Sequence, residues 1–375
     1  MFHFQFSIFN FQLLALLLVI IACGGNTDAP PPAVAVELSV APAGTLTVAS
    51  AAGSRYITVT ANTEWSLTAD RDWCAFTPYM GYAGQTPVKI TTPDWYGDHP
   101  RTATLTFRAG AFTHSCTVVQ EGSELTIETP QGYVLVWHDE FDSPRSPSGA
   151  AALPDANSWW YETGDSGWGN NELQNYIPAI SGADTCAALY DGILRITAKK
   201  RGNQVLSVRM NTVEGWLYGY FEARIKLPGG RGTWPAFWMM PQNFTAWPDD
   251  GEIDIMEEVG YRPNYVLSTI HCKAYYHGAG TQKSGERYVA TAETAFHVYA
   301  LEWTPDHIRG FVDGENYFTF PNDRQGNRNT WPFNAPFYLK LNLAWGGNWG
   351  GAEGVDEAAL PARYEIDYVR VFQKE

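Results

Sequence analysis

Three carboxylates lie within six residues of the chain. They are Glu252, Asp254 and Glu257, and apolar residues separate them. Acidic side chains are poor strand formers and costly to bury, whereas Ile is a good strand former. A segment that combines the two needs a reason to hold its acids. Close carboxylates can provide a nucleophile and a general acid, because mutual repulsion and burial raise at least one pKa toward neutrality.

Strand geometry decides where these acids point. Side chains alternate between faces, so Glu252 and Asp254 share one face. Strict alternation would send Glu257 to the opposite face, so we predict a β-bulge near Met256 that restores the parity. The two Glu carboxylates would then lie about 5 Å apart, which is the separation found in retaining glycosidases.

Two features of this segment allow other interpretations. An acidic surface strand or a calcium loop could also carry three acids, but calcium loops are rich in Gly, Asn and Asp and seldom alternate with Ile. Glu258 directly follows Glu257 and faces the core by parity. An unpaired buried carboxylate is expensive. Either the strand therefore ends there, or Glu258 has a cationic partner.

The surroundings of the acids resemble the family 16 glycoside hydrolases, in the form with a bulged Glu-x-Asp-x-x-Glu motif. The unbulged form has one residue fewer. The resemblance covers residues 133–375 and is closest to bacterial laminarinases, which are endo-β-1,3-glucanases. The blocks that carry it, in family order, are residues 137–141, 167–176, 218–224, 232–241, 247–248 and 365–371.

The resemblance implies a retaining endo-β-glucanase acting on β-1,3 linkages of laminarin-like and mixed-linkage glucans. Glu252 would be the nucleophile, Glu257 the acid/base, and Asp254 would tune Glu252. The implied fold is a β-jelly-roll sandwich with an open substrate cleft, and no organic cofactor is expected. Two alternatives stay open. One is a galactan hydrolase of the same fold, and the other is a non-catalytic surface glycan-binding lipoprotein, which would have no use for all three carboxylates.

Further side chains are candidates for substrate binding. Trp234 and Trp238 are four residues apart on a predicted strand and therefore share a face. By the resemblance they flank the sugar next to the nucleophile. The remaining candidates, for which turn or core roles are the alternative, are Asn171, Glu172, Arg209, His271 and Trp349.

A structural calcium ion is a further expectation. By the resemblance, calcium is held on the convex face by an Asp and by backbone carbonyls, and oxygen ligands suit this ion. Glu140 and Asp367 are the candidate ligands. The alternative is that these carboxylates lie at strand ends and pair with Arg370 or Lys374.

Composition supports an all-β protein. The 375 residues suffice for two or three domains, and Gly (35), Pro (23) and aromatic residues (14%) are frequent, while long amphipathic helical patterns are missing. The net charge of −15 excludes nucleic acid as a partner. We expect a monomer that binds a neutral β-glucan. The five cysteines contain no CxxC pair, so buried free thiols are expected.

The first 34 residues predict an exported lipoprotein. Residues 13–21 form an apolar run that is too short for a membrane span, so residues 1–22 are expected to be a signal peptide. The sequence Ile-Ile-Ala-Cys-Gly around Cys23 resembles a bacterial lipobox, although the first seven residues contain no Lys or Arg. Cys23 would then carry the lipid that anchors the protein to a bacterial outer membrane. Residues 23–34 read as a tether.

Residues 35–122 predict a separate small immunoglobulin-like β-sandwich. Short strand patterns alternate there with turn signals. The segments 62–65 and 119–122, together with Trp73, resemble BACON domains. We favour a spacer with Trp65 and Trp73 in its core, and the alternative is that an exposed Trp95-Tyr96 pair stacks on sugar. Residues 123–132 would link this unit to the catalytic domain at 133–375.

Overall fold

The computed structural model describes residues 35–93, 95, 100–122, 127–142 and 152–374. The predictions for the signal peptide, Cys23, the tether and Tyr96 lie outside these residues. Nearly all regular structure in the described residues is strand, with two short 3₁₀ helices at His277–Ala279 and Glu357–Ala359. Within the described ranges, no helix is long and apolar enough to cross a membrane.

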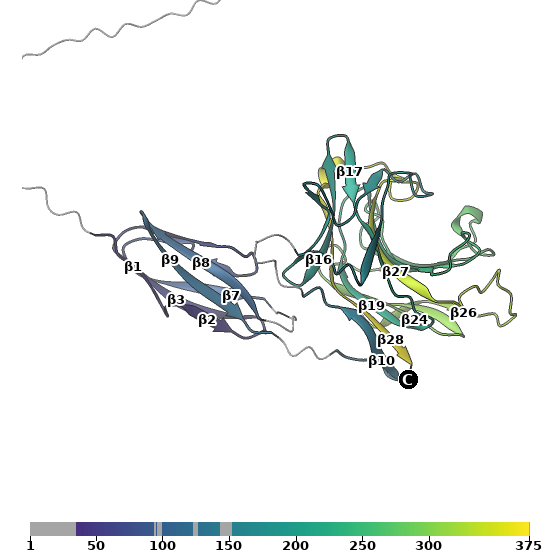
Figure 1. Ribbon diagram of the computed structural model, residues 1–375, viewed down its shortest axis with the longest axis horizontal. Coiled ribbons are helices and arrows are strands. Elements are labelled where there is room, and N and C mark those ends of the chain that lie inside the picture. The colour runs from purple at the N-terminus through teal and green to yellow at the C-terminus, as the bar shows by residue number, and fades with distance from the viewer. Residues whose placement is uncertain (1–34, 94, 96–99, 123–126, 143–151, 375) are drawn as a thin grey trace, which may run out of the picture.

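Two sheets enclose one hydrophobic core in the N-terminal part of the chain (Figure 1). One sheet has the order β1-β3-β7-β5, with bounds Leu38–Ala41, Gly53–Ala61, Gly84–Thr92 and Ala75–Thr77. The other has the order β2-β9-β8-β4-β6, with bounds Thr45–Val48, Phe112–Gln120, Arg101–Ala109, Trp65–Ala69 and Met80–Gly81. Trp65 and Trp73 are both buried in this core, as the spacer interpretation expects.

Two larger sheets form the rest of the molecule. The seven-stranded sheet has the order β11-β18-β27-β20-β21-β22-β23, with bounds Trp159–Glu162, Arg209–Thr212, Phe337–Trp345, Thr233–Pro241, Glu252–Glu257, Tyr265–His271 and Lys283–Tyr288. The main path of the ten-stranded sheet is β12-β17-β16-β28-β19-β24-β25-β26, with bounds Gln174–Tyr176, Gln204–Ser207, Ile193–Arg201, Ala362–Lys374, Gly219–Lys226, His297–Trp303, His307–Val312 and Glu315–Pro321. Its two other strands are β10 (Tyr133–Asp139) and β15 (Ala187–Tyr190), and a separate hairpin joins β13 (Ile180–Ser181) to β14 (Asp184–Thr185).

Alternation along the strands separates the core from the site. On β27, Leu339, Leu341 and Leu343 are fully buried in the core between the two large sheets. Lys340 and Asn342 point to the opposite face of the same sheet. The predicted all-β sandwich is confirmed, and the seven-stranded sheet presents polar residues on the face that turns away from the core.

The exposed Trp95 that the sugar-stacking alternative assumed is buried in the structure. Its side chain is only 8% exposed, and the Arg101 guanidinium lies 4.4 Å from its ring centroid. Gly192 lies in the turn between β15 and β16 and packs directly against the Trp95 ring. A Cβ at this position would lie 2.6 Å from the ring. Only glycine permits this approach. A turn of the C-terminal unit therefore covers Trp95, which has no free face on which a sugar could stack.

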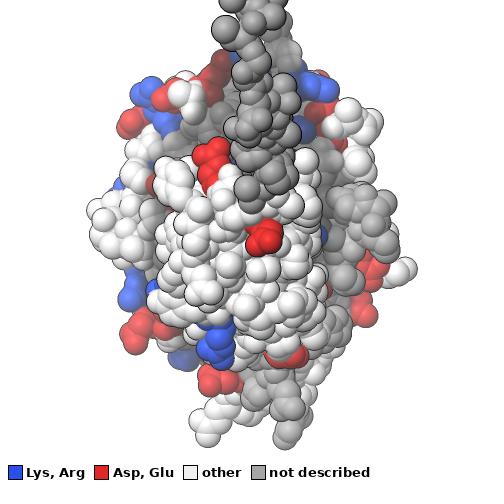
Figure 2. All heavy atoms as spheres, turned by 90° about the vertical axis from the view of Figure 1, so that its left-hand side faces the viewer, with Lys and Arg blue, Asp and Glu red and all other residues white. Residues whose placement is uncertain are grey.

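The four described cysteines are not paired in disulfides. Cys74, Cys116, Cys186 and Cys272 are buried free thiols, as predicted, and burial raises the pKa of each. Figure 2 shows the end of the molecule that the N-terminal unit forms. On the described part of this face, charged side chains of both signs are scattered, and its centre is mostly uncharged.

Candidate active site

The three acids lie on β21, in the middle of the seven-stranded sheet. Asp254 pairs with Trp238 on β20 and with Thr269 on β22, whereas Glu257 pairs with Ala236 and Leu267. The register shifts between Asp254 and Glu257. The two intervening residues, Ile255 and Met256, are both fully buried in the core. The predicted bulge is therefore confirmed, and it returns Glu257 to the face that carries Glu252 and Asp254.

Two neighbours orient the carboxylate of Glu252. The indole Nε1 of Trp247 donates a hydrogen bond of 2.8 Å to Oε2 of Glu252. His271, which is paired with Glu252 across the strands, places Nε2 at 4.0 Å from Oε1 of Glu252 and at 3.4 Å from Oδ2 of Asp254. The ring of Trp247 in turn packs against His277, with centroids 5.0 Å apart. Glu252 is thus held from two sides while 17% of its side chain stays exposed.

All three carboxyl groups have raised pKa values, where the sequence predicted at least one. Burial raises the pKa of Glu252 to about 8 and that of Asp254 to about 7, and burial together with the charge of Asp254 raises the pKa of Glu257 well above its usual range. His271 and the Trp247 hydrogen bond act in the opposite direction on Glu252. A hydrogen bond between Glu252 and Asp254 raises the pKa of Glu252 and lowers that of Asp254. Glu257 is therefore suited to hold a proton at neutral pH.

The predicted tryptophans lie beside these acids. Trp234 donates from Nε1 to Oε1 of Glu257 over 2.9 Å. The ring of Trp349 meets Trp234 edge-to-face, with centroids 5.4 Å apart. Trp234 therefore adjoins Glu257, and Trp349 packs against Trp234.

Trp238 is fixed by a chain of hydrogen bonds. Its Nε1 donates to Oδ1 of Asn342 over 2.7 Å, and the Asn342 amide donates to the hydroxyl of Tyr176 over 3.1 Å. That hydroxyl donates to Oε2 of Glu172 over 3.1 Å. Glu172 is only 8% exposed, so it is the buried end of the hydrogen-bond chain that holds Trp238. Its neighbour Asn171 is exposed and donates to Asn348 over 2.8 Å.

Arg209 also lies on this face. Its Nε donates to Oε2 of Glu162 over 2.6 Å. Its guanidinium lies 4.7 Å from the ring centroid of Trp168 and 4.8 Å from that of Trp238. The structure therefore brings Arg209 and Trp238 into contact, as their shared candidacy for sugar binding requires.

Sequence reasoning missed three residues of this face. Trp247 lies in a loop, where alternation predicts no direction, and nothing in the sequence pointed to its bond with Glu252. Glu162 lies on a short edge strand. Lys340 could have been found, because it is the single charged residue in the strand sequence 337–345.

Glu258 resolves the alternatives left open for it. Strand β21 ends at Glu257, and Glu258 is fully buried, where it accepts a hydrogen bond from the backbone N–H of Asn264. Among the described residues, no cation pairs with it. Burial, helped by the nearby charge of Glu293, raises the pKa of Glu258 to about 8.

The two proposed calcium ligands are paired with arginines. Glu140 accepts two hydrogen bonds of 2.9 Å from Arg370, which is the alternative foreseen from the sequence. Asp367 accepts one of 2.5 Å from Arg224. A metal ion at these two carboxylates would therefore have to displace their arginine partners. In the described part of the chain, the group whose ligand atoms lie within 4.8 Å of one another is Glu252, Asp254 and His271, which belongs to the acid cluster.

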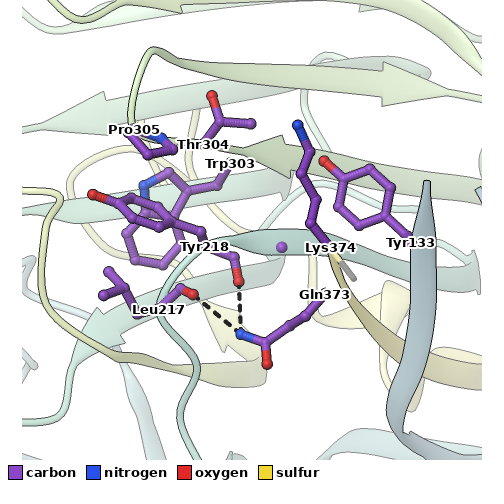
Figure 3. Close-up of a pocket in the computed structure, with 9 residues that line it drawn as sticks. Tyr133, Leu217, Tyr218, Trp303, Thr304, Pro305, Gln373 and Lys374 are labelled. Atoms are coloured by element: carbon purple, nitrogen blue, oxygen red, sulfur yellow. Dashed lines mark hydrogen bonds between the residues drawn. The ribbon is translucent and has the colours of Figure 1, made fainter. Parts of the chain in front are cut away.

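A cavity of about 300 Å³ lies on the other large sheet (Figure 3). Tyr133, Tyr218 and Lys374 line it, and the amide of Gln373 donates to the backbone carbonyls of Leu217 and Tyr218. None of its lining residues is one of the three acids or contacts them in the bonds described above. This cavity is therefore separate from the catalytic face.

Comparisons with known proteins identify the family. Residues 176–370, more than half of the chain, match the model described as Glycosyl hydrolases family 16. The chain belongs to glycoside hydrolase family 16. Residues 61–121 match BACON, described as a putative binding domain, N-terminal. Both resemblances noted in the sequence are thus confirmed.

Individual relatives are similar over the same region. A "Beta-glucanase" of Rhodothermus marinus is 47% identical over 265 residues, which span 67% of this chain and 89% of that protein. The structure of the laminarinase from Rhodothermus marinus has a TM-score of 0.60 at 47% identity, covering 65% of this chain and 98% of that one. A mutant of SCLam, a non-specific endo-β-1,3(4)-glucanase co-crystallised with 1,3-β-D-cellotriosyl-glucose, has a TM-score of 0.60 at 44% identity, covering 66% of this chain and 97% of that one.

Proposed function

We propose that this family 16 glycoside hydrolase is a retaining endo-β-glucanase that cleaves β-1,3 linkages in laminarin-like glucans and in mixed-linkage β-1,3/1,4-glucans. The observation that carries the proposal is the bulged strand β21, which aligns Glu252, Asp254 and Glu257 on one face beside Trp234 and Trp238. The relatives supply the substrate class, because they are a β-glucanase, a laminarinase and an endo-β-1,3(4)-glucanase.

The mechanism uses the carboxyl groups alone. Glu257 holds the proton and delivers it to the glycosidic oxygen, while Glu252 attacks the anomeric carbon and forms a glycosyl ester. The bond to the leaving sugar breaks as its oxygen is protonated. Glu257, now ionised, removes a proton from water, which opens the ester and regenerates Glu252. Asp254, which is hydrogen-bonded to Glu252, tunes the pKa of Glu252. Glycoside hydrolysis of this kind needs no organic cofactor.

The stereochemistry of the first product tests this mechanism. Retention requires two carboxyls about 5 Å apart, whereas inversion requires roughly 6.5–9.5 Å. We expect NMR of freshly cleaved glucan to show a β-configured reducing end before mutarotation. An α-configured first product would overturn the roles given to Glu252 and Glu257.

The substrate is tested by reducing-end release from laminarin, curdlan, barley mixed-linkage glucan, agarose and carrageenan. We expect cleavage of the first three. Cleavage of agarose or carrageenan alone would establish the galactan hydrolase alternative within the same fold. Failure to cleave any of them, with retained binding, would establish the glycan-binding lipoprotein alternative.

The cellular setting is a further part of the proposal. We propose that the protein is a monomer anchored to a bacterial outer membrane through a lipid on Cys23, because residues 1–23 resemble a lipoprotein signal. Cys23→Ala should move the protein from the membrane fraction to the soluble fraction of the producing cell. Unchanged membrane association in that variant would contradict the anchor.

The calcium ion also remains a proposal. Binding at Glu140 and Asp367 would require both carboxylates to leave their arginine partners. The test is the melting temperature with and without EDTA. A decrease of several degrees that calcium reverses would support the site, and an unchanged melting temperature would eliminate it.

A further inference from the structure

A lysine is buried on the catalytic face of the sheet. The side chain of Lys340 is 0% exposed, and its Nζ lies 2.6 Å from Oε2 of Glu162 and 2.6 Å from Oδ1 of Asn211. The rings of Trp238 and Tyr338 lie 4.9 and 5.0 Å from the same nitrogen. Burying an ammonium group is costly even when it is paired. A strand that is otherwise apolar or neutral therefore keeps this charge at a cost in stability.

The partner of Lys340 lies in the same cross-strand row as the proposed acid/base. Strand pairing joins Glu257 to Ala236, Ala236 to Asn342, Asn342 to Arg209 and Arg209 to Glu162. Residues paired in this way point to one face of the sheet. Four strand steps of about 4.8 Å separate the backbones of β21 and β11, or roughly 19 Å in all. Glu162 thus faces the same side as Glu257, and its strand lies several sugar lengths of a polymer away from the strand that carries the reacting residues.

One carboxylate oxygen of Glu162 carries two cations and the other carries none. Arg209 and Lys340 both donate to Oε2, each over 2.6 Å. No described residue bonds to Oε1, and the side chain is 23% exposed. Burial alone would raise the pKa of Glu162, but the two cations outweigh burial and hold its pKa below the ordinary value. Glu162 is therefore an ionised acceptor with one oxygen available beside Trp238.

We propose that Glu162 is a substrate-binding residue that accepts a hydrogen bond from a hydroxyl of the glucan, and that Lys340 is the positioning residue that aims it. The inference rests on the proposed β-glucan substrate. A glucosyl unit supplies hydroxyl donors at its rim, while the ring of Trp238 supplies an apolar surface for its C–H face. Lys340 lies too deep to touch the sugar, so it acts through Glu162.

Binding of laminarihexaose to the full-length Glu252→Gln protein, measured by calorimetry, tests this assignment without turnover. Glu162→Gln in this background should raise the dissociation constant about tenfold or more, which is the effect of losing one hydrogen bond to a charged acceptor. Lys340→Met should raise the dissociation constant by a similar factor. The double variant should stay within about twofold of Glu162→Gln, because the two residues act as one unit.

The matched control is Glu365→Gln. Glu365 also accepts from two cations, Arg195 and Lys226, but it lies on β28 of the other sheet. This variant should leave the dissociation constant unchanged. The double variant also covers the case in which Glu162→Gln unfolds the protein by leaving Lys340 unpaired, since it removes both charges.

Three outcomes decide the matter. Unchanged affinity in the folded Glu162→Gln or double variant would overturn the binding role. Independent, multiplicative losses, about hundredfold in the double variant, would overturn the claim that Lys340 acts through Glu162. If the Glu252→Gln protein does not bind laminarihexaose, the proposed substrate fails instead, and the same variants are then compared on the polymer that the wild type cleaves.

Discussion

At the scale of single residues, the site depends on how Glu252 is held. An attacking carboxylate must be ionised and aimed, yet burial and Asp254 both raise its pKa. Trp247 and His271 oppose this rise, and neither is an acid. The nucleophile therefore depends on a loop tryptophan and a neighbouring strand as much as on β21 itself.

Glu252→Gln should lower kcat on laminarin by about 10⁴-fold, a loss typical of removing a nucleophile that works with a partner group. The variant should keep its melting temperature or exceed that of the wild type, because the site trades stability for function. Initial rates and thermal melts check both statements. Activity near the wild-type level would refute the assignment of Glu252.

Trp247→Phe removes the indole N–H that stabilises ionised Glu252. Loss of a donor to the charged form raises the pKa of a carboxyl group, so the acid limb of kcat/KM against pH should move to higher pH. We expect a shift of about 0.5–1 pH unit and a loss of roughly three- to tenfold at pH 6. Trp160→Phe is the control, since Trp160 is similarly exposed but donates to the Thr212 carbonyl. Equal pH profiles for both variants would argue against the role of Trp247.

At the scale of elements, the buried carboxyl group of Glu258, directly after β21, makes the stability of the fold depend on pH. The pKa of Glu258 is about 4.3 in an unfolded chain and about 8 in the folded protein. The unfolded state releases this proton at the lower pH. The contribution of protonated Glu258 to the free energy of unfolding is therefore complete below about pH 4. It is lost progressively as the pH rises to about 8.

Glu258→Gln cannot ionise, so it should melt higher than the wild type at pH 8, by roughly 10 °C, and the difference should vanish near pH 4. Thermal melts across this range provide the measurement. Glu286→Gln, which alters an exposed pair with Arg262, is the control and should show no such trend. A constant difference between Glu258→Gln and the wild type at all pH values would contradict the burial of an ionisable group.

The sequence was informative where periodicity governs position. Parity predicted the bulge at residues 255–256 and the shared face of Trp234 and Trp238. It could not predict Trp247, because a loop has no period, or the burial of Trp95, because the covering turn at residue 192 is distant in the chain. For Glu140, ion pairing and metal binding need the same carboxylate, and only the position of Arg370 distinguishes them.

At the scale of the whole molecule, the N-terminal unit has its own core and touches the catalytic unit through Trp95. Its candidate sugar-stacking side chain is thus occupied. Removing residues 1–132 should leave kcat/KM on laminarin within about twofold. It should also leave the retardation in a β-glucan affinity gel, measured against a gel without glucan, unchanged. Clearly weaker retardation of the truncated protein would show that the unit binds glucan and is more than a spacer.

The bulge on β21 also bears on how family 16 sequences can change length. Ile255 and Met256 both point into the core, so losing one of them would restore strict alternation and still leave all three carboxylates on one face. The result would be the shorter motif of the unbulged members. The deletion would leave a void in the core, which lowers the free energy of unfolding by about 2–5 kcal/mol. It would not point any of the acids to the wrong face. A single-codon deletion in the middle of an active-site strand is thus an evolutionary step that the chemistry can survive, provided that the core is repacked.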